Sequence, residues 1–151
     1  MTQAKPVTTV PALAQVPLAD GFSMPARFDE HARTLVTWPP REEASNTDLE
    51  GFRAEVEALI KSISEFEPVT MLVDPNDEAD ARARCGDYAD FIVLPVDASW
   101  IRDNGPIFVR DADMQVAAVR FEFNGWGGRV PFEKTAAMPL LLASNLEMRC
   151  Y

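Results

Sequence analysis

The chain has 151 residues and a formal net charge of −10. This balance argues against binding to a nucleic-acid backbone, which requires clustered Lys and Arg side chains, and no apolar run reaches the roughly 20 residues of a membrane-spanning helix. Cys85 and Cys150 form neither a disulfide framework nor a metal-ligand spacing. These properties predict one soluble domain, with the cytoplasm as the default location.

The first 22 residues mix Thr, Ala, Val, Gln and Pro without periodicity. We predict that residues 1–22 form a flexible N-terminal arm. The globular part is expected over residues 23–151.

A strand, a helix and a second strand are predicted first. Residues 33–38 are β-prone and end at Pro39. The pattern Thr47-x-x-Glu50 is a capping box, which indicates a helix start. Behind it, apolar residues recur at helical spacing at Phe52, Val56, Leu59, Ile60 and Ile63. Pro68 ends this helix, and the apolar run 69–73 predicts a buried strand.

The next predicted elements are a short helix and three strands. Residues 74–77 supply a turn and a helix N-cap, and Gly86 is expected to end the helix. Residues 91–94 predict another buried strand. A loop over 96–106 should then lead into paired strands at 107–109 and 116–123.

The last predicted elements are a loop over 124–128 and a helix over 134–146, in which Pro139 forces a kink or a late start. The resulting order β-α-β-α-β-β-β-α predicts an α/β fold. No glycine-rich phosphate loop follows any predicted strand, so the sequence does not favour a nucleotide-binding fold.

The loop after the strand at 91–94 carries the densest set of functional groups. A carboxylate accepts two parallel N–H bonds from a guanidinium, and an indole face attracts a cation. The presence of Asp103 near Trp100 in the sequence therefore predicts a guanidinium clamp, a carboxylate that binds the substrate's guanidinium group. Asp97 is expected to brace the loop. The alternative is that Arg102 and Asp103 are structural and Trp100 belongs to the core.

A second segment, 121–128, places three glycines, Gly125, Gly127 and Gly128, around Trp126. This density of glycine predicts a tight loop in which the backbone approaches another group. A surface turn with a packed Trp126 is the alternative interpretation.

Three further residues could titrate or react. His31 is the only histidine, and a lone His in a polar run is more often structural than catalytic. Cys85 follows Arg84, whose charge could lower the thiol pKa, but no second histidine is available to serve a nucleophile. Cys150 has only one residue after it, whereas a catalytic thiol needs a supporting shell.

Three segments resemble, in order, motifs of the agmatine deiminases and the related bacterial peptidyl-arginine deiminases. The first is Met24-Pro25-Ala26, followed by residues 31–34 and Trp38-Pro39. The second is residues 100–106, which resemble Trp-x-Arg-Asp-x-Gly-Pro. The third is residues 123–128, which resemble Phe-Asn-x-Trp-Gly-Gly. Asn104 stands where Thr is more usual.

The resemblance implies a pentein-type α/β propeller, of which this chain would hold about two of five ββαβ modules. It implies hydrolysis of agmatine to N-carbamoylputrescine and ammonia, in putrescine biosynthesis, without metal or organic cofactor. The residue matching Asp103 binds the guanidinium, and the one matching Trp100 helps to wall the pocket. Loop support would come from Asp97, Arg102, Gly105, Asn124, Trp126, Gly127 and Gly128.

The catalytic His and Cys of that family have no counterpart in the sequence, and their matching positions would lie beyond Tyr151. We therefore expect a truncated enzyme whose own activity is doubtful. The alternatives are a non-catalytic remnant, a split-enzyme fragment, or specificity for peptidyl-arginine. The expected partners are the small cation agmatine and either further copies of the chain or a complementing C-terminal fragment, with no nucleic acid and no membrane.

Overall fold

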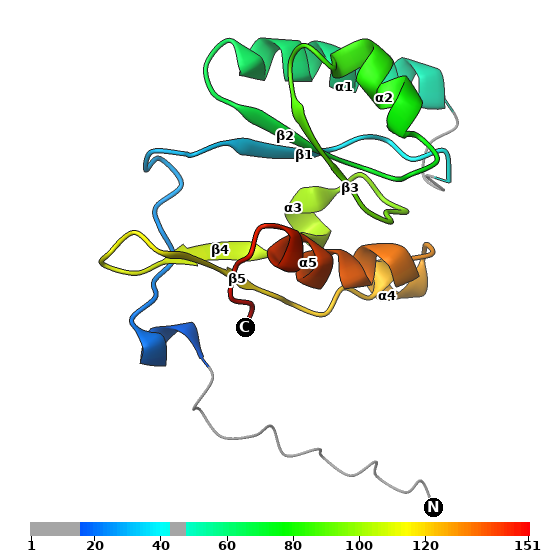
Figure 1. Ribbon diagram of the computed structural model, residues 1–151. Helices are drawn as coiled ribbons and strands as arrows, with labels where there is room; N and C mark the ends of the chain where they lie inside the picture. Colours follow the sequence, from blue (N-terminus) through cyan, green and yellow to red (C-terminus); the bar gives the residue numbers. More distant parts are fainter. Residues whose placement is uncertain (1–15, 43–47) are drawn as a thin grey trace, which may run out of the picture.

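A computed structural model describes residues 16–42 and 48–151. It contains a parallel three-stranded sheet, an antiparallel strand pair, and helices on both sides of the parallel sheet (Figure 1). The strands are β1 (Thr34–Thr37), β2 (Val69–Val73), β3 (Asp90–Val93), β4 (Ile107–Arg110) and β5 (Val116–Val119). The helices are η1 (Pro17–Asp20, a 3-10 helix), α1 (Leu49–Ser64), α2 (Glu78–Cys85), α3 (Ile101–Asn104), α4 (Gly125–Gly128) and α5 (Glu133–Asn145).

The predicted order of long elements is confirmed, and with it the α/β class. The single-turn helix α3 occupies part of a segment that was predicted to be a loop, whereas α4 is a left-handed turn within the predicted loop over 124–128. Strand β5 ends at Val119 instead of continuing to residue 123. Val119 pairs with Ile107, the first residue of β4, and Pro106 before it has no N–H to extend the ladder.

Strand β2 is the centre of the fold. It lies between β1 and β3, and all five of its residues are buried. Its alternate residues Val69, Met71 and Val73 belong to the core beneath α1 and α2, whereas Leu72 packs in a second core with Met138 and Leu142 of α5. Because both faces are covered, the strand is a continuous apolar run, as predicted.

Strand β3 was predicted to be buried, and this is wrong. It forms one edge of the parallel sheet, so its residues are only partly covered. Phe91 packs against the first core and Ile92 against the second. Val93, the last residue of the strand, is 38% exposed.

Helix α1 begins one residue later than the capping box suggests. Its N-cap is Asp48, whose Oδ1 accepts a hydrogen bond from the N–H of Gly51 at 2.9 Å. Thr47, the predicted cap, lies outside the described residues. The predicted apolar face is also narrower than expected, because Leu59 is 51% exposed while Val56 and Ile60 are buried.

A buried ion-pair network joins α1 to the start of α2. The guanidinium of Arg53 donates to Asp77 Oδ1 at 2.8 Å, to Asp80 Oδ2 at 2.8 Å, and to the Pro39 carbonyl at 2.9 and 3.0 Å. Arg41 also donates to both carboxylate oxygens of Asp77. Asp77 holds the predicted N-cap position of α2, but its side chain makes no capping bond because the two arginines occupy it.

The Asp77 carboxyl makes stability depend on pH. Burial by itself raises its pKa, but the hydrogen bonds from Arg41 and Arg53 outweigh burial, so the pKa lies below the ordinary value of 3.8. Because this pKa is lower in the folded state than in the unfolded state, the ionised Asp77 carboxylate stabilises the fold above pH 3.8. This stabilisation is lost as the pH falls through the folded-state pKa. We expect the free energy of unfolding to drop in that acidic range. Urea titrations should show a smaller drop for Asp77→Asn, and an unchanged drop would contradict this assignment.

The second sheet is extended by residues near the end of the chain. The Ala118 N–H donates to the Arg149 carbonyl at 2.8 Å, and the Tyr151 N–H donates to the Ala118 carbonyl at 2.9 Å. Cys150 thus forms a parallel bridge with Ala118, after α5 has crossed from β5. Strands β4 and β5, helix α5 and residues 149–151 therefore follow one another as a ββαβ unit.

The predicted N-terminal arm is described only in part, because residues 1–15 lie outside the described residues. Residues 17–20 form η1, and the Tyr151 hydroxyl donates to Asp20 Oδ2 at 2.7 Å. The predicted division of the chain at residue 22 stays a prediction. No helix in the described ranges is long and apolar enough to cross a membrane.

Candidate functional site

The first predicted motif forms the single-turn helix α3, which lies between the parallel sheet and the β4–β5 pair (Figure 1). The Trp100 carbonyl accepts from the N–H groups of Asp103, at 2.9 Å, and Asn104, at 3.2 Å. Gly105 closes the turn, since a Cβ there would lie 2.5 Å from the Ile101 carbonyl oxygen. The turn leaves Asp103 exposed and buries Asn104.

The second predicted motif folds as a left-handed turn. Gly125, Trp126, Gly127 and Gly128 have φ values of 63°, 52°, 82° and 76°. The side chain of Asn124 accepts from the Gly127 N–H at 2.9 Å and so closes the turn. A left-handed conformation costs an L-residue roughly 1–2 kcal/mol, but glycine almost nothing. The three glycines thus remove most of the strain, and what remains falls on Trp126.

The fold brings these two turns into contact. The indole Nε1–H of Trp126 donates to Asp103 Oδ2 at 3.2 Å. The two residues are 23 positions apart in the sequence, and each belongs to a different predicted motif. The sequence predicts both as site residues, but it contains no signal for the hydrogen bond between them.

An aromatic stack supports Trp126 from behind. Its ring meets Phe123 edge to face at 5.1 Å, and Phe123 meets Phe132 in the same way at 6.3 Å. Phe132 was not predicted as part of the site. It is the N-cap residue of α5, and only the folding of the left-handed turn onto the start of α5 makes it a support.

Asp97 is buried and fully engaged with α5. Its Oδ2 accepts from the Lys134 N–H at 3.1 Å, and its Oδ1 accepts from the Thr135 N–H at 3.0 Å and from the Thr135 hydroxyl. The carboxylate therefore neutralises the positive N-terminus of α5. It ties the motif loop to α5 and does not pair with Asp103.

The structural alternative for the first motif gives Arg102 and Asp103 structural roles, one of them paired with the backbone or a neighbouring acid, and places Trp100 in the core. Within residues 16–42 and 48–151, no ion pair joins Arg102 to Asp103. Trp100 is 50% exposed and so lies outside the core. Arg102 is exposed and lines a separate hollow of about 450 Å³ together with His31 and Arg33.

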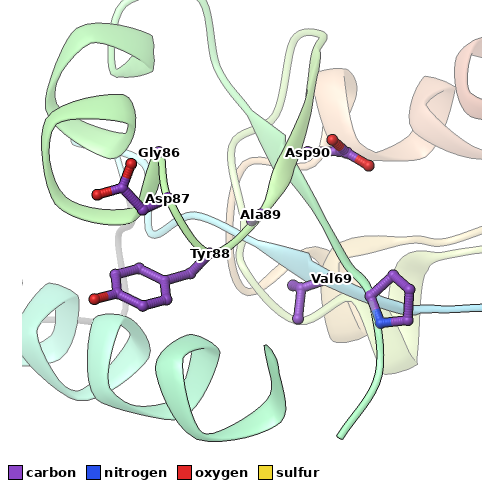
Figure 2. Close-up of a pocket in the computed structure, with 7 residues that line it drawn as sticks. Val69, Gly86, Asp87, Tyr88, Ala89 and Asp90 are labelled. Atoms are coloured by element: carbon purple, nitrogen blue, oxygen red, sulfur yellow. The ribbon is translucent and has the colours of Figure 1, made fainter. Parts of the chain in front are cut away.

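Asp103 lines neither the hollow beside Arg102 nor a second one on the described surface. Figure 2 shows one of about 260 Å³ beside the α2–β3 connection, where the Tyr88 ring points toward α1 and Asp90 points away from it. No predicted site residue lines this hollow. Asp103 is exposed and touches the Trp126 indole, so a cation bound there by this chain alone stays in contact with water.

His31, Cys85 and Cys150 do not form a pair of nucleophile and general base in the described structure, since no contact joins the imidazole to either thiol. Burial, reinforced by the Glu57 carboxylate, raises the pKa of the Cys85 thiol to about 11. The charge of Arg84 does act to lower this pKa, as expected, but burial and the Glu57 carboxylate outweigh it. His31 pairs with Glu67 at 3.3 Å, and Cys150 lies beside β5.

The described residues contain no group of three or more His, Cys, Asp or Glu side chains arranged to hold a metal ion. Of the side chains in the two predicted motifs, the fold brings the Asp103 carboxylate and the Trp126 indole into contact.

The model of the Porphyromonas-type peptidyl-arginine deiminase family matches residues 23–151, and the chain belongs to this family. The agmatine deiminase of Ectopseudomonas mendocina (strain ymp) is 38% identical over 117 residues, which cover 77% of this chain and 32% of that protein. The agmatine deiminase of Pseudomonas aeruginosa (strain LESB58) is 39% identical over 113 residues, or 74% of this chain and 31% of that protein. The chain thus spans about a third of the length of these curated relatives.

Solved structures of agmatine deiminases share the fold. The Enterococcus faecalis enzyme superposes with a TM-score of 0.85 at 22% identity, covering 93% of this chain and 40% of that one. The C. jejuni enzyme gives a TM-score of 0.69 at 19% identity, covering 85% of this chain and 38% of that one. At these identities the comparison shows the pentein-type fold only.

Proposed function

We propose that this chain supplies the guanidinium-binding part of an agmatine deiminase. The observation that carries the proposal is the Asp103 carboxylate, which is exposed and has no cationic partner among the described residues. It accepts a hydrogen bond from the Trp126 indole and follows Trp100 by three residues in the α3 turn, and the family and the named relatives favour a guanidine as ligand. A carboxylate can accept two parallel N–H bonds from a guanidinium while an indole faces the delocalised charge.

The reaction also needs groups that Asp103 cannot provide. A thiolate must attack the guanidinium carbon, and ammonia must leave after protonation to give an S-alkylthiouronium adduct. Water must then add to the same carbon and expel the thiolate. The role of Asp103 is to fix the nitrogens so that the carbon meets the nucleophile. We propose that the His and Cys for these steps come from the part of the longer relatives that this chain does not match.

The architecture follows from the same proposal. The unit formed by β4, β5, α5 and residues 149–151 is one ββαβ module of a five-module propeller, and Asp103 lies just before it. The remaining modules would enclose the open surface around Asp103. A complementing C-terminal fragment or a longer chain supplies them, and agmatine is favoured over peptidyl-arginine because the relatives are named for agmatine.

A chimera tests the proposal directly. The part of this chain that matches the Pseudomonas aeruginosa agmatine deiminase, 39% identical over 113 residues, replaces the corresponding segment of that enzyme. We expect the chimera to release ammonia from agmatine, and the Asp103→Asn chimera to lose most of this activity. A folded chimera that releases no ammonia would overturn the proposed function.

A further inference from the structure

Trp126 occupies an unusual backbone position for a bulky residue. It is the one residue of the left-handed turn that is not glycine, with a φ of 52°. Backbone strain of this kind persists where the surrounding structure holds it, and it gathers at functional sites. This strained position fixes the direction of the indole, whose contacts indicate its role.

The indole acts on one oxygen of Asp103. Its Nε1–H donates to Oδ2 at 3.2 Å, and in the described part of the chain this is the only hydrogen bond that the carboxylate receives. An exposed carboxylate otherwise rotates freely between its rotamers. Each carboxylate oxygen has two lone pairs, so Oδ1 and the second lone pair of Oδ2 remain available to a forked donor.

The indole itself is held from two sides. The left-handed turn sets the direction of its Cβ, and Phe123 meets the ring edge to face at 5.1 Å. Phe123 in turn rests against Phe132 at 6.3 Å, at the start of α5. At Gly125, a Cβ would lie 2.6 Å from the Phe132 ring, so the turn is packed tightly against this stack.

We propose that Trp126 is a positioning residue for the guanidinium-binding carboxylate of Asp103, held by the left-handed turn and by the stack of Phe123 and Phe132. The indole orients Asp103 before the ligand arrives, so that less rotational freedom is lost on binding. This inference rests on the proposed function, because it requires that Asp103 bind a guanidinium.

A double-mutant cycle on the 151-residue chain tests the inference, with agmatine as the probe and the dissociation constant measured by NMR titration. Trp126→Phe keeps an aromatic ring in the turn but removes the N–H. We expect it to weaken agmatine binding by about threefold to tenfold, the usual effect of one hydrogen bond. Asp103→Asn should weaken it by more, and the double variant should bind no worse than Asp103→Asn alone.

The matched control is Tyr88→Phe, which removes a polar hydrogen from another partly exposed aromatic side chain, at 40% against 37% for Trp126. It should leave agmatine binding unchanged. A second readout needs no change at Trp126. In Asp103→Asn the indole N–H signal of Trp126 should shift, while that of buried Trp38 should stay in place.

The possible results separate the two ideas. Losses that add in the double variant, or a Trp126 signal that ignores Asp103→Asn, would overturn the positioning role and leave the guanidinium site intact. If Trp126→Phe does not fold, the Trp126 signal in Asp103→Asn decides alone. If the wild-type chain binds agmatine no better than Asp103→Asn does, the proposed function fails and the positioning role fails with it.

Discussion

Replacement of Arg53 by Ala should lower the free energy of unfolding by about 3–5 kcal/mol, the usual result of removing one partner of a buried ion pair. Arg53 is almost fully buried and donates to Asp77, Asp80 and the Pro39 carbonyl. Its loss leaves the Asp77 carboxylate, of which 1% is exposed, with Arg41 as its remaining cationic partner. Because small domains are stable by only about 5–15 kcal/mol, urea denaturation should show a large drop in the midpoint.

Arg82→Ala is the matched control. Arg82 also pairs with an acid, Glu78, at 2.7 Å, but the two side chains are 50% and 36% exposed. An exposed pair one helical turn apart is worth roughly 0.3–0.5 kcal/mol, so this variant should lose less than about 1 kcal/mol. An equal decrease in the free energy of unfolding in Arg53→Ala and Arg82→Ala would show that the buried network contributes no more to stability than an exposed ion pair.

Asp103→Asn should lower kcat/KM for agmatine by roughly thirtyfold to several thousandfold in the chimera with the Pseudomonas aeruginosa enzyme. The variant keeps the size of the side chain but turns an amide N–H toward a cation. Loss of a charge-assisted contact in an enclosed site costs about 2–5 kcal/mol, and ~1.4 kcal/mol corresponds to a tenfold change. Steady-state ammonia release measures this ratio.

Asp97→Asn is the control for the same loop. Asp97 accepts hydrogen bonds from the N–H groups of Lys134 and Thr135 at the start of α5, so its loss should act through the fold. We expect destabilisation of about 1 kcal/mol, as for a lost helix cap, and a smaller fall in kcat/KM than at Asp103. Retained activity with a collapsed melt in Asp103→Asn would make Asp103 structural, and the site assignment would then be wrong.

The long elements could be predicted because their signals are local. The apolar run 69–73 indicates a strand covered on both faces, and β2 is such a strand. The boundaries were less predictable where neighbouring groups compete. Thr47 and Asp48 can both cap a helix, and only the geometry selects Asp48. Asp77 holds an N-cap position, yet two arginines from distant segments occupy its carboxylate.

The site shows the same division. Residue type and spacing singled out the motif containing Asp103 and the glycine-rich segment around Trp126, but only their resemblance to a known family favoured a functional role over a structural one. Their contact could not be predicted, because the hydrogen bond crosses 23 residues and depends on a left-handed turn. The role of Phe132 could not be predicted from the sequence, because Phe132 supports Trp126 only when the turn packs against the start of α5.

The most direct test of the guanidinium site compares agmatine with putrescine, which has an amine in place of the guanidinium. Both are dications, so nonspecific attraction to a chain of net charge −10 is the same for each. In ¹H–¹⁵N spectra, agmatine should give saturable shifts centred on residues 100–105 and 124–128, and putrescine should give much weaker ones. Equal shifts with both ligands, or shifts centred elsewhere, would contradict a guanidinium site at Asp103.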